Sequence, residues 1–309
     1  MTTPLITAHE LHERLTHDPR PVVLDVRWAL GDPHGREHFA QRRIPGSRYV
    51  DLDSELAAPP TARHGRHPLP KLEDLQAAAR RWGVRQGEGV VVLDDNGSLA
   101  AARAWWLLTW AGVADVRVLD GGLGAWQAAG FELAEGPTEP DGTVGGDVTL
   151  TSGRLPTLEA DQAAALARTG VLLDARAAER YRGESEPIDP RAGHIPGAVC
   201  APTAENLAPD ATFQPADRLR ARFARLGVPR AEPGSVGVYC GSGVTAAHQI
   251  LALRLAGLDA ALYPGSWSQW SSDPDRPIAV GAEPGNPPAD AGPADTTPAA
   301  ATAGPGTDL

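Results

Sequence analysis

Cysteine and lysine are scarce in this chain of 309 residues, and each scarcity excludes a class of chemistry. With 2 cysteines the chain cannot build a disulfide framework, which favours a cytoplasmic protein with at least one free thiol. Lysine occurs once, at Lys71, among 28 basic residues, so few options remain for lysine-based catalysis.

The chain also lacks long apolar runs and an excess of positive charge. No apolar stretch approaches the roughly 18 residues that a membrane helix needs, and the first residues show neither the basic region nor the apolar core of a secretory signal. The net charge of −11 makes nucleic acid and anionic membrane surfaces poor candidates for partners. These absences predict a protein that acts on small molecules or on other proteins.

What the chain does contain is an internal repeat. Four sequence blocks of the first half return in the same order in the second half: residues 24–27 as 173–176, 43–47 as 194–198, 91–94 as 237–240, and 120–126 as 264–270. Matched blocks in a constant order predict a duplicated domain.

Both copies alternate short apolar strands with helices. In the first copy Thr7 and Glu10 form a capping box for a helix that ends near residue 15. Further strands are expected at 22–26, 89–93, 116–119, 171–174, 236–240 and 260–263, and helices at 72–82, 100–111, 158–168, 216–226 and 245–256. Short buried strands that alternate with helices predict an α/β fold, in which each domain is a mostly parallel sheet with helices on both faces.

Composition sets the expected domain boundaries. We predict a first domain at residues 1–136, a Gly-, Pro- and Thr-rich linker at 137–156, and a second domain at 157–281. Residues 282–309 contain almost no large apolar side chain, so they are expected to form a disordered tail.

The strongest chemical signal is Cys240, which follows an apolar strand and precedes a small-residue loop and a helix. Backbone N–H groups and the positive end of a helix stabilise a thiolate, which is the reactive form of cysteine. The candidate N–H donors around the sulfur are Gly241, Ser242, Gly243, Val244 and Thr245. The alternatives are an inert buried cysteine and an ordinary strand-to-helix turn.

These blocks resemble the rhodanese superfamily in its tandem two-domain form. The resemblance rests on residues 240–246, on the paired Ile-Pro-Gly blocks, and on residues 263–270, and it spans about residues 4–280. It implies a catalytic second domain and a non-catalytic first domain, with Asp94 at the place of the cysteine. It also implies sulfur transfer through a persulfide on Cys240, which needs neither a metal nor an organic cofactor.

The loop sequence Cys-Gly-Ser-Gly-Val-Thr resembles that of the 3-mercaptopyruvate sulfurtransferases, whereas thiosulfate enzymes typically have Cys-Arg-Lys-Gly-Val-Thr. The resemblance implies transfer of a sulfane sulfur from 3-mercaptopyruvate to a thiophilic acceptor, which is cyanide or a thiol, with thioredoxin as one candidate. Thiosulfate:cyanide sulfurtransferase and a non-enzymatic persulfide carrier are the alternatives. A cysteine phosphatase needs an arginine six residues after the cysteine, where this chain has Ala246.

The resemblance also suggests roles for residues outside the loop. Arg180 lies where the family holds the donor carboxylate, and Arg191 is a candidate second clamp; surface ion pairing is the alternative for both. Ser242 would belong to a proton relay with Asp32 as the partner acid. Arg43 replaces the histidine that the family has before Ile-Pro-Gly in the first domain, which leaves the relay incomplete.

Several other residues have a structural and a functional interpretation. His67 could approach the site from the first domain, whereas His248 is expected on a helix surface or between domains. Cys200 is expected to be a small buried hydrophobe, and a redox partnership with Cys240 stays open. An aspartate and an arginine two residues later recur in both copies and predict a buried ion pair: Asp25 with Arg27, and Asp174 with Arg176.

Overall fold

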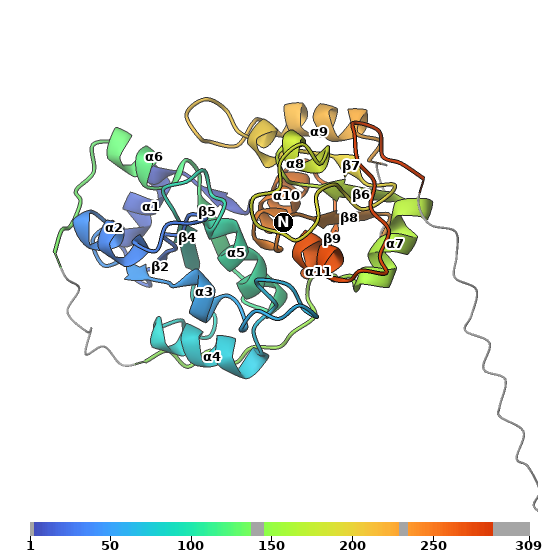
Figure 1. The fold of residues 1–309 in the computed structure, drawn as a ribbon. Coiled ribbons are helices and arrows are strands. Elements are labelled where there is room, and N and C mark those ends of the chain that lie inside the picture. Colours follow the sequence, from blue (N-terminus) through green and yellow to red (C-terminus); the bar gives the residue numbers. More distant parts are fainter. Residues whose placement is uncertain (1–2, 137–144, 229–233, 287–309) are drawn as a thin grey trace, which may run out of the picture.

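Two α/β units lie side by side in the protein (Figure 1). The computed structural model describes residues 3–136, 145–228 and 234–286. The first sheet has the strand order β1-β5-β4-β2-β3, with bounds Leu5–Ile6, Val116–Leu119, Val90–Leu93, Val22–Asp25 and Arg48–Tyr49. The second sheet has the order β7-β6-β8-β9, with bounds Val199–Cys200, Val171–Asp174, Val236–Tyr239 and Ala261–Leu262. Every strand pairing within these two sheets is parallel, which confirms the predicted fold class.

The two sheets repeat one another. Strands β2 to β5 correspond to β6 to β9 in order and in neighbours. The first sheet adds β1, which pairs with β5 through Leu5 and Val118. In the second unit the equivalent place is taken by a single parallel bridge between Thr157 and Leu262. The duplication seen in the sequence is therefore a duplication of topology.

The helices fall into two groups, long ones that the periodicity predicts and short ones that it does not. The first unit has α1 to α6, at Ala8–Leu15, Gly35–Gln41, Leu52–Glu55, Leu72–Arg81, Ala101–Trp110 and Gly122–Ala128. The second has α7, α8, the 3-10 helix η1, and α9 to α11, at Ala160–Thr169, Ala178–Tyr181, Thr203–Asn206, Ala216–Arg225, Val244–Leu255 and Ser266–Ser272. The predicted capping box of Thr7 and Glu10 is present at the start of α1.

Each sheet has apolar side chains on both faces because helices cover both. In the first unit Val23 packs with α1 and α6, whereas its neighbour Leu24 packs on the opposite face with α4 and α5. In the second unit Leu172 faces α7 and α11, and Leu173 faces α9 and α10. Successive strand residues point to opposite faces, so these continuous apolar strands are buried on both faces of the sheet.

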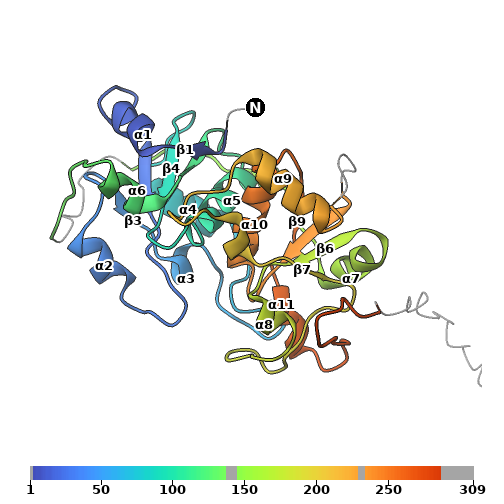
Figure 2. The same cartoon turned by 90° about the horizontal axis from the view of Figure 1, so that it is seen from above.

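The two units meet through α5 and α10, which pack against each other at the centre of the molecule (Figure 2). One apolar cluster runs without a break from Leu24 in the first sheet to Leu262 in the second, and it includes the buried Trp105 and Trp106. The carboxyl ends of β4 and β8 lead directly into this contact, so the loop after β8 begins at the boundary between the units.

The segments outside the predicted domains are packed where the structure describes them. In the predicted linker 137–156, Val148 and Leu150 are buried and the Gly146 N–H donates to the Arg80 carbonyl oxygen at 2.8 Å; residues 137–144 lie outside the described residues. The disordered tail was expected from residue 282, but the Pro284 carbonyl accepts a hydrogen bond of 2.6 Å from the Gly197 N–H. That boundary is too early, and residues 287–309 lie outside the described residues.

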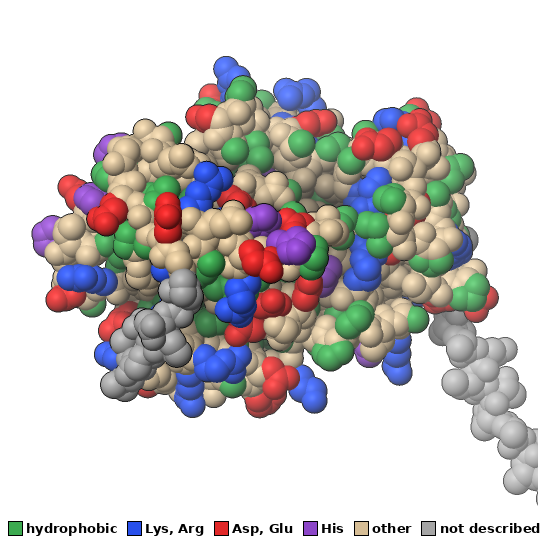
Figure 3. Space-filling view, turned by 60° about the vertical axis from the view of Figure 1, so that its left-hand side comes forward, with side chains coloured by type: hydrophobic (Ala, Val, Ile, Leu, Met, Phe, Trp, Pro, Cys, Tyr) green, Lys and Arg blue, Asp and Glu red, His purple; other side chains and the backbone are tan. Residues whose placement is uncertain are grey.

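The surface carries charges of both signs. On the face drawn in Figure 3, acidic and basic side chains alternate over the first unit, and histidines gather near its middle. None of the helices in the described part of the chain combines the length and the apolar character that a membrane crossing requires.

Candidate active site

Cys240 is the first residue after β8, and its side chain lies inside the loop that leads to α10. Its Sγ accepts a hydrogen bond of 3.1 Å from the Gly243 N–H, and the residue is 2% exposed. Gly243 has φ 81°, and a Cβ at this position would lie 2.6 Å from the Pro264 carbonyl oxygen. Only glycine fits such a turn without strain, and the turn directs its amide at the sulfur.

Residues at the start of α11 form hydrogen bonds with the backbone of this loop. The Trp267 N–H donates to the Cys240 carbonyl and the Ser268 N–H donates to the Gly241 carbonyl, both at 2.9 Å. The Ser266 hydroxyl accepts from the Cys240 N–H at 3.2 Å. These bonds orient the Cys240 and Gly241 carbonyl groups toward α11 and thus away from the sulfur.

In the first unit the equivalent loop forms hydrogen bonds with the carboxylate of its own residue Asp94. Asp94 follows β4, is fully buried, and accepts four backbone N–H bonds of 2.9–3.0 Å from Asn96, Ser98, Ala100 and Ala101. Burial has the largest effect on the pKa of Asp94 and raises it, whereas these bonds lower it. A strand end followed by a loop and a helix start thus directs several N–H groups at one acceptor. The comparison within one molecule supports the same property for the Cys240 loop, where the Gly243 amide bond to sulfur is described. The predicted sulfur contacts of the Gly241, Ser242, Val244 and Thr245 amides stay predictions.

A hydrogen-bonded chain of three side chains joins the loop to the first unit. The Ser242 hydroxyl lies 2.7 Å from His67 Nδ1, and His67 Nε2 lies 3.1 Å from Asp53 Oδ1. Because the carboxylate only accepts, the Nε2 atom carries the proton and Nδ1 accepts from the hydroxyl. Burial, followed by the charge of Arg103, lowers the pKa of His67, whereas Asp53 raises it. His67 is therefore placed to act as a neutral base.

Asp32 is not the acid of this chain, contrary to the prediction. Its carboxylate accepts from the His34 N–H and pairs with His38 Nε2 at 2.9 Å, at the surface beside α2. The sequence did not indicate Asp53, which lies in α3 and bonds to His67. The sequence did indicate His67 as a residue that could approach the site, and its hydrogen bond to Asp53 extends that prediction.

Two arginines flank the Cys240 loop. A Cβ built on Gly241 would lie 3.0 Å from Arg66 Nη2 and 3.5 Å from Arg180 Nη1. The structure therefore brings the predicted Arg180 to the loop and adds Arg66 from the first unit, which the sequence did not single out. Arg180 pairs with Glu186 at 2.5 Å and with Asp189 at 3.3 Å, and Arg66 pairs with Asp189 as well.

Arg191 does not serve as the second clamp. Its guanidinium donates to the backbone carbonyls at the end of α11 and just beyond it: Trp270, Ser271, Asp273 and Arg276. Cations at a helix C-terminus satisfy carbonyls that have no partner within the helix. The side chain is thus committed to structure, whereas Arg66 lies beside the Cys240 loop.

Arg103 adds a buried cation from the domain contact. It lies on α5 and donates to the backbone carbonyls of Leu56, His67, Pro68 and Gly243. Burial lowers the pKa of Arg103 to about 10, while the charge of Cys240 acts in the opposite direction. The side chain therefore ties the His67 segment to the Cys240 loop and places positive charge near the sulfur.

The other residues with both a structural and a functional interpretation lie in environments that favour the structural one. Asp25 and Asp174 form the predicted buried ion pairs, at 2.7 Å with Arg27 and with Arg176. Burial and the neighbouring Asp174 raise the pKa of Cys200 to about 11, which disfavours its thiolate. His248 is fully buried and stacks on Phe213.

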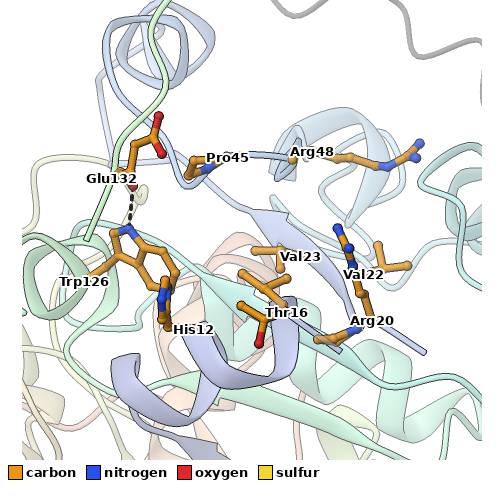
Figure 4. A pocket seen from close by; sticks show the side chains of 12 residues that line it. His12, Thr16, Arg20, Val22, Val23, Pro45, Arg48, Trp126 and Glu132 are labelled. Atoms are coloured by element: carbon orange, nitrogen blue, oxygen red, sulfur yellow. Dashed lines mark hydrogen bonds between the residues drawn. The ribbon is translucent and has the colours of Figure 1, made fainter. Parts of the chain in front are cut away.

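A cavity of about 410 Å³ lies elsewhere, in the first unit. His12, Thr16, Arg20 and Trp126 line it around the start of β2 (Figure 4). Its lining contains no cysteine or serine. A second cavity of about 300 Å³ lies between the units, and Arg66, Asp189 and Ser268 line it. Arg66, which lines this second cavity, also approaches Gly241 of the Cys240 loop.

Known proteins share this arrangement over nearly the whole chain. A family model for the rhodanese-like domain matches residues 7–129 and 159–273. The putative thiosulfate sulfurtransferase SseB of Mycobacterium tuberculosis is 48% identical over 282 residues, which cover 90% of this chain and 97% of the relative. A probable 3-mercaptopyruvate sulfurtransferase of Pseudomonas aeruginosa is 46% identical over 288 residues, with 90% and 98% covered.

A solved structure agrees with these sequence matches. The crystal structure of the 3-mercaptopyruvate sulfurtransferase SseA from Escherichia coli aligns with a TM-score of 0.73 at 32% identity and covers 86% of this chain and 99% of that one. The relatives are sulfurtransferases and share both halves of the fold. The chain belongs to the rhodanese family, with one rhodanese-like domain in each half.

Proposed function

We propose that the protein transfers a sulfane sulfur from 3-mercaptopyruvate to a thiophilic acceptor through a persulfide on Cys240. The observation that carries the choice of donor is the chain Ser242–His67–Asp53 beside the sulfur. A donor that is itself a thiol brings a proton that must move during the reaction. Thiosulfate has no such proton, because sulfite leaves as an anion.

In the first half-reaction the Cys240 thiolate attacks the sulfur of 3-mercaptopyruvate. An S–S bond forms, the C–S bond breaks, and its electron pair goes to the carbon of the departing pyruvate enolate. The proton from the donor thiol ends on that carbon, so the products are pyruvate and the Cys240 persulfide. Ser242 and His67 are placed to carry this proton. Arg180 and Arg66 supply guanidinium groups for the donor carboxylate.

In the second half-reaction a thiolate or cyanide attacks the outer sulfur of the persulfide. The S–S bond breaks and the Cys240 thiolate returns, as in other thiol exchange reactions. The Gly243 amide, 3.1 Å from Sγ, supports negative charge on the sulfur in both halves. The acceptors we propose are cyanide, small thiols and a cytoplasmic protein thiol such as thioredoxin.

Thiosulfate is the second candidate donor, because the relative with 48% identity is named a putative thiosulfate sulfurtransferase. A comparison of both donors in one assay separates the two. We expect a higher kcat/KM for 3-mercaptopyruvate in the cyanide-dependent reaction. The reverse ranking would contradict the proposed donor while leaving sulfur transfer intact.

The mechanism itself is tested on the thiol. Incubation with the donor is expected to add the mass of one sulfur atom to the peptide that contains Cys240. Cys240→Ser should abolish this gain and the turnover, and Cys200→Ser is the matched control that keeps both. A Cys240→Ser protein with full turnover would falsify the mechanism. Persulfide formation without turnover to any acceptor would instead favour a carrier.

A further inference from the structure

The two arginines beside the Cys240 loop already have carboxylate partners inside the protein. Asp189 pairs with Arg66 of the first unit and, at 3.3 Å, with Arg180 of the second. Glu186 pairs with Arg180 at 2.5 Å and with Arg176 at 3.3 Å. The guanidinium groups that a donor needs are therefore occupied by acidic side chains of one segment, residues 184–190, which follows α8.

Both carboxylates are removed from water, and they differ in how they are held. The side chains of Glu186 and Asp189 are each 3% exposed. Glu186 also accepts the backbone N–H groups of Ile188 and Asp189, at 3.3 and 3.1 Å, so its own loop fixes it. The described hydrogen-bond partners of the Asp189 carboxylate are the two arginines. Asp189 is thus the carboxylate that a competing anion would replace.

Asp189 lines the cavity between the units and pairs with the two arginines that approach the Cys240 loop. The cavity of about 300 Å³ between the units is lined by Arg66, Ile188 and Asp189 together with residues 60–62 and the start and end of α11. Arg66 touches this cavity on one side and approaches Gly241 on the other. An anion that enters from the cavity meets the ion pair of Arg66 and Asp189 before it reaches Cys240.

We infer that Asp189 is a specificity-determining residue, whose carboxylate stands at the place of the donor's anionic group and selects a donor with one negative charge over a dianion. The inference rests on the proposed function of the site. The donor carboxylate exchanges with Asp189 on Arg66 and Arg180, so one carboxylate replaces another. A dianion of similar size adds a charge that the site does not balance.

The charges around the loop support this selection. Three arginines, Arg66, Arg176 and Arg180, face three carboxylates, Asp174, Glu186 and Asp189. Arg103 adds one positive charge and a Cys240 thiolate adds one negative charge. The described groups therefore sum to about zero before a donor arrives. Like charges in a partly buried site repel strongly, so the second charge of thiosulfate is disfavoured.

The test replaces the carboxylate without changing its size, as Asp189→Asn in the full chain. We expect the KM for thiosulfate to fall more than the KM for 3-mercaptopyruvate, with little change in kcat. The ratio of the two kcat/KM values should move toward thiosulfate by about tenfold, which corresponds to one lost charge repulsion in a partly screened site. Asp189→Glu keeps the charge and should keep the ratio near that of the parent protein.

Glu184→Gln is the matched control. Glu184 belongs to the same segment and carries the same charge, but its carboxylate pairs with Arg182 at the surface. Its removal should leave the donor ratio unchanged. An unchanged ratio in Asp189→Asn, or an equal shift in both variants, would overturn the inference.

A binding measurement tests the role of Asp189 independently of whether the proposed reaction takes place. Sulfate and pyruvate serve as dianionic and monoanionic probes of the Cys240→Ser protein, and calorimetry reports their affinities. Addition of Asp189→Asn should tighten sulfate binding by about tenfold and pyruvate binding by less. Equal effects on the two anions contradict the role of Asp189 even if turnover proceeds as proposed. Failure of the wild-type protein to take up sulfur contradicts the proposed function and leaves the binding result standing.

Discussion

At the scale of single residues, the site depends on where each side chain finds its partner. Asp32 and Asp53 are both carboxylates of the first unit, and each pairs with a histidine. Asp32 pairs with His38 at the surface, whereas Asp53 pairs with His67, which reaches Ser242 across the domain boundary. The same chemical pair is therefore structural in one place and, in the proposed mechanism, part of the proton path in the other.

Asp53→Asn is expected to lower kcat with 3-mercaptopyruvate by about 10-fold, less than the 10²–10⁴-fold typical of a whole acid–base residue. The amide no longer fixes the His67 tautomer. It also removes a charge that raises the pKa of His67, so the acidic limb of the pH–rate profile should move to lower pH. Steady-state kinetics from pH 5 to 9 measure both effects.

Asp32→Asn is the matched control for this variant, because it changes the same residue type in the same unit. It should leave kcat and the pH profile as they are. A loss of activity in Asp53→Asn without any displacement of the acidic limb would point to a structural role instead. With thiosulfate as the donor the effect of Asp53→Asn should be smaller, because no donor proton moves.

At the scale of elements, one strand–loop–helix unit occurs twice with two different hydrogen-bond acceptors. The first copy places the carboxylate of Asp94 among four backbone N–H groups. The second places the Cys240 sulfur at the Gly243 amide. The loops differ in length, because α5 begins at Ala101, seven residues after Asp94, and α10 begins at Val244, four residues after Cys240. The shorter loop brings the sulfur to the domain boundary together with Ser242.

Asp94→Ala should destabilise the first unit without touching the chemistry. It leaves four N–H groups without their acceptor, three of them buried, and each buried group costs about 1–3 kcal/mol, partly offset by structural relaxation and by the removal of a buried carboxyl group. We expect a loss of about 3 kcal/mol in the free energy of unfolding and an unchanged kcat per folded molecule. Urea unfolding and active-site titration measure the two quantities.

The exposed Asp259 provides the comparison for this loss. Asp259→Asn should change the free energy of unfolding by less than about 0.5 kcal/mol, as for most surface substitutions. Equal stability of Asp94→Ala and the parent protein would show that the four bonds contribute little to folding.

The sequence predicted elements well where a pattern is local. Strand 171–174 was predicted at its observed bounds, and the capping box at Thr7 was correct, because apolar strands and helix caps are specified by neighbouring residues. Short helices such as α8 and α11 were missed, since fewer than two full helical turns show no clear period. Cys240, Ser242 and Arg180 were found from the loop and from family resemblance.

The partners of these residues were the part that the sequence did not specify. Asp53 and Arg66 precede Cys240 by more than 170 positions and reach it only because the two units pack face to face. Arg191 was predicted to bind the donor because a guanidinium suits a carboxylate, but it donates hydrogen bonds to the backbone carbonyls at the end of α11 instead. Contacts between units depend on the docking angle of α5 and α10, and no local pattern encodes that angle.

At the scale of the whole molecule, the two units share one core and one site. The apolar cluster that joins Leu24 to Leu262 makes the packing of each unit depend on the other. The site depends on the same contact, because the first unit contributes His67, Arg66 and Arg103 to a loop of the second. The first domain, which has no thiol of its own, therefore supplies part of the proposed active site.

His248 links this shared core to pH. It lies on α10, fully buried, stacked on Phe213, and the charge of Arg222 acts on it. Burial lowers the pKa of His248 to about 3, from an ordinary value of 6.5. Above pH 6.5 the ring is neutral in both the folded and the unfolded chain. As the pH falls below 6.5 the unfolded chain binds a proton that the folded chain does not, so stability is lost progressively down to about pH 3.

The measurement is the free energy of unfolding of the parent protein and of His248→Gln between pH 8 and pH 4. The difference between the two should be constant above about pH 7 and should change by up to 1.4 kcal/mol per pH unit below pH 6, with the variant relatively more stable in acid. His17→Gln, at an exposed position after α1, is the control and should parallel the parent curve. Parallel curves for His248→Gln and the parent would mean that the ring is hydrated and protonated in the folded protein. In that case the contact between the units would be open to water at α10, contrary to a shared and continuous core.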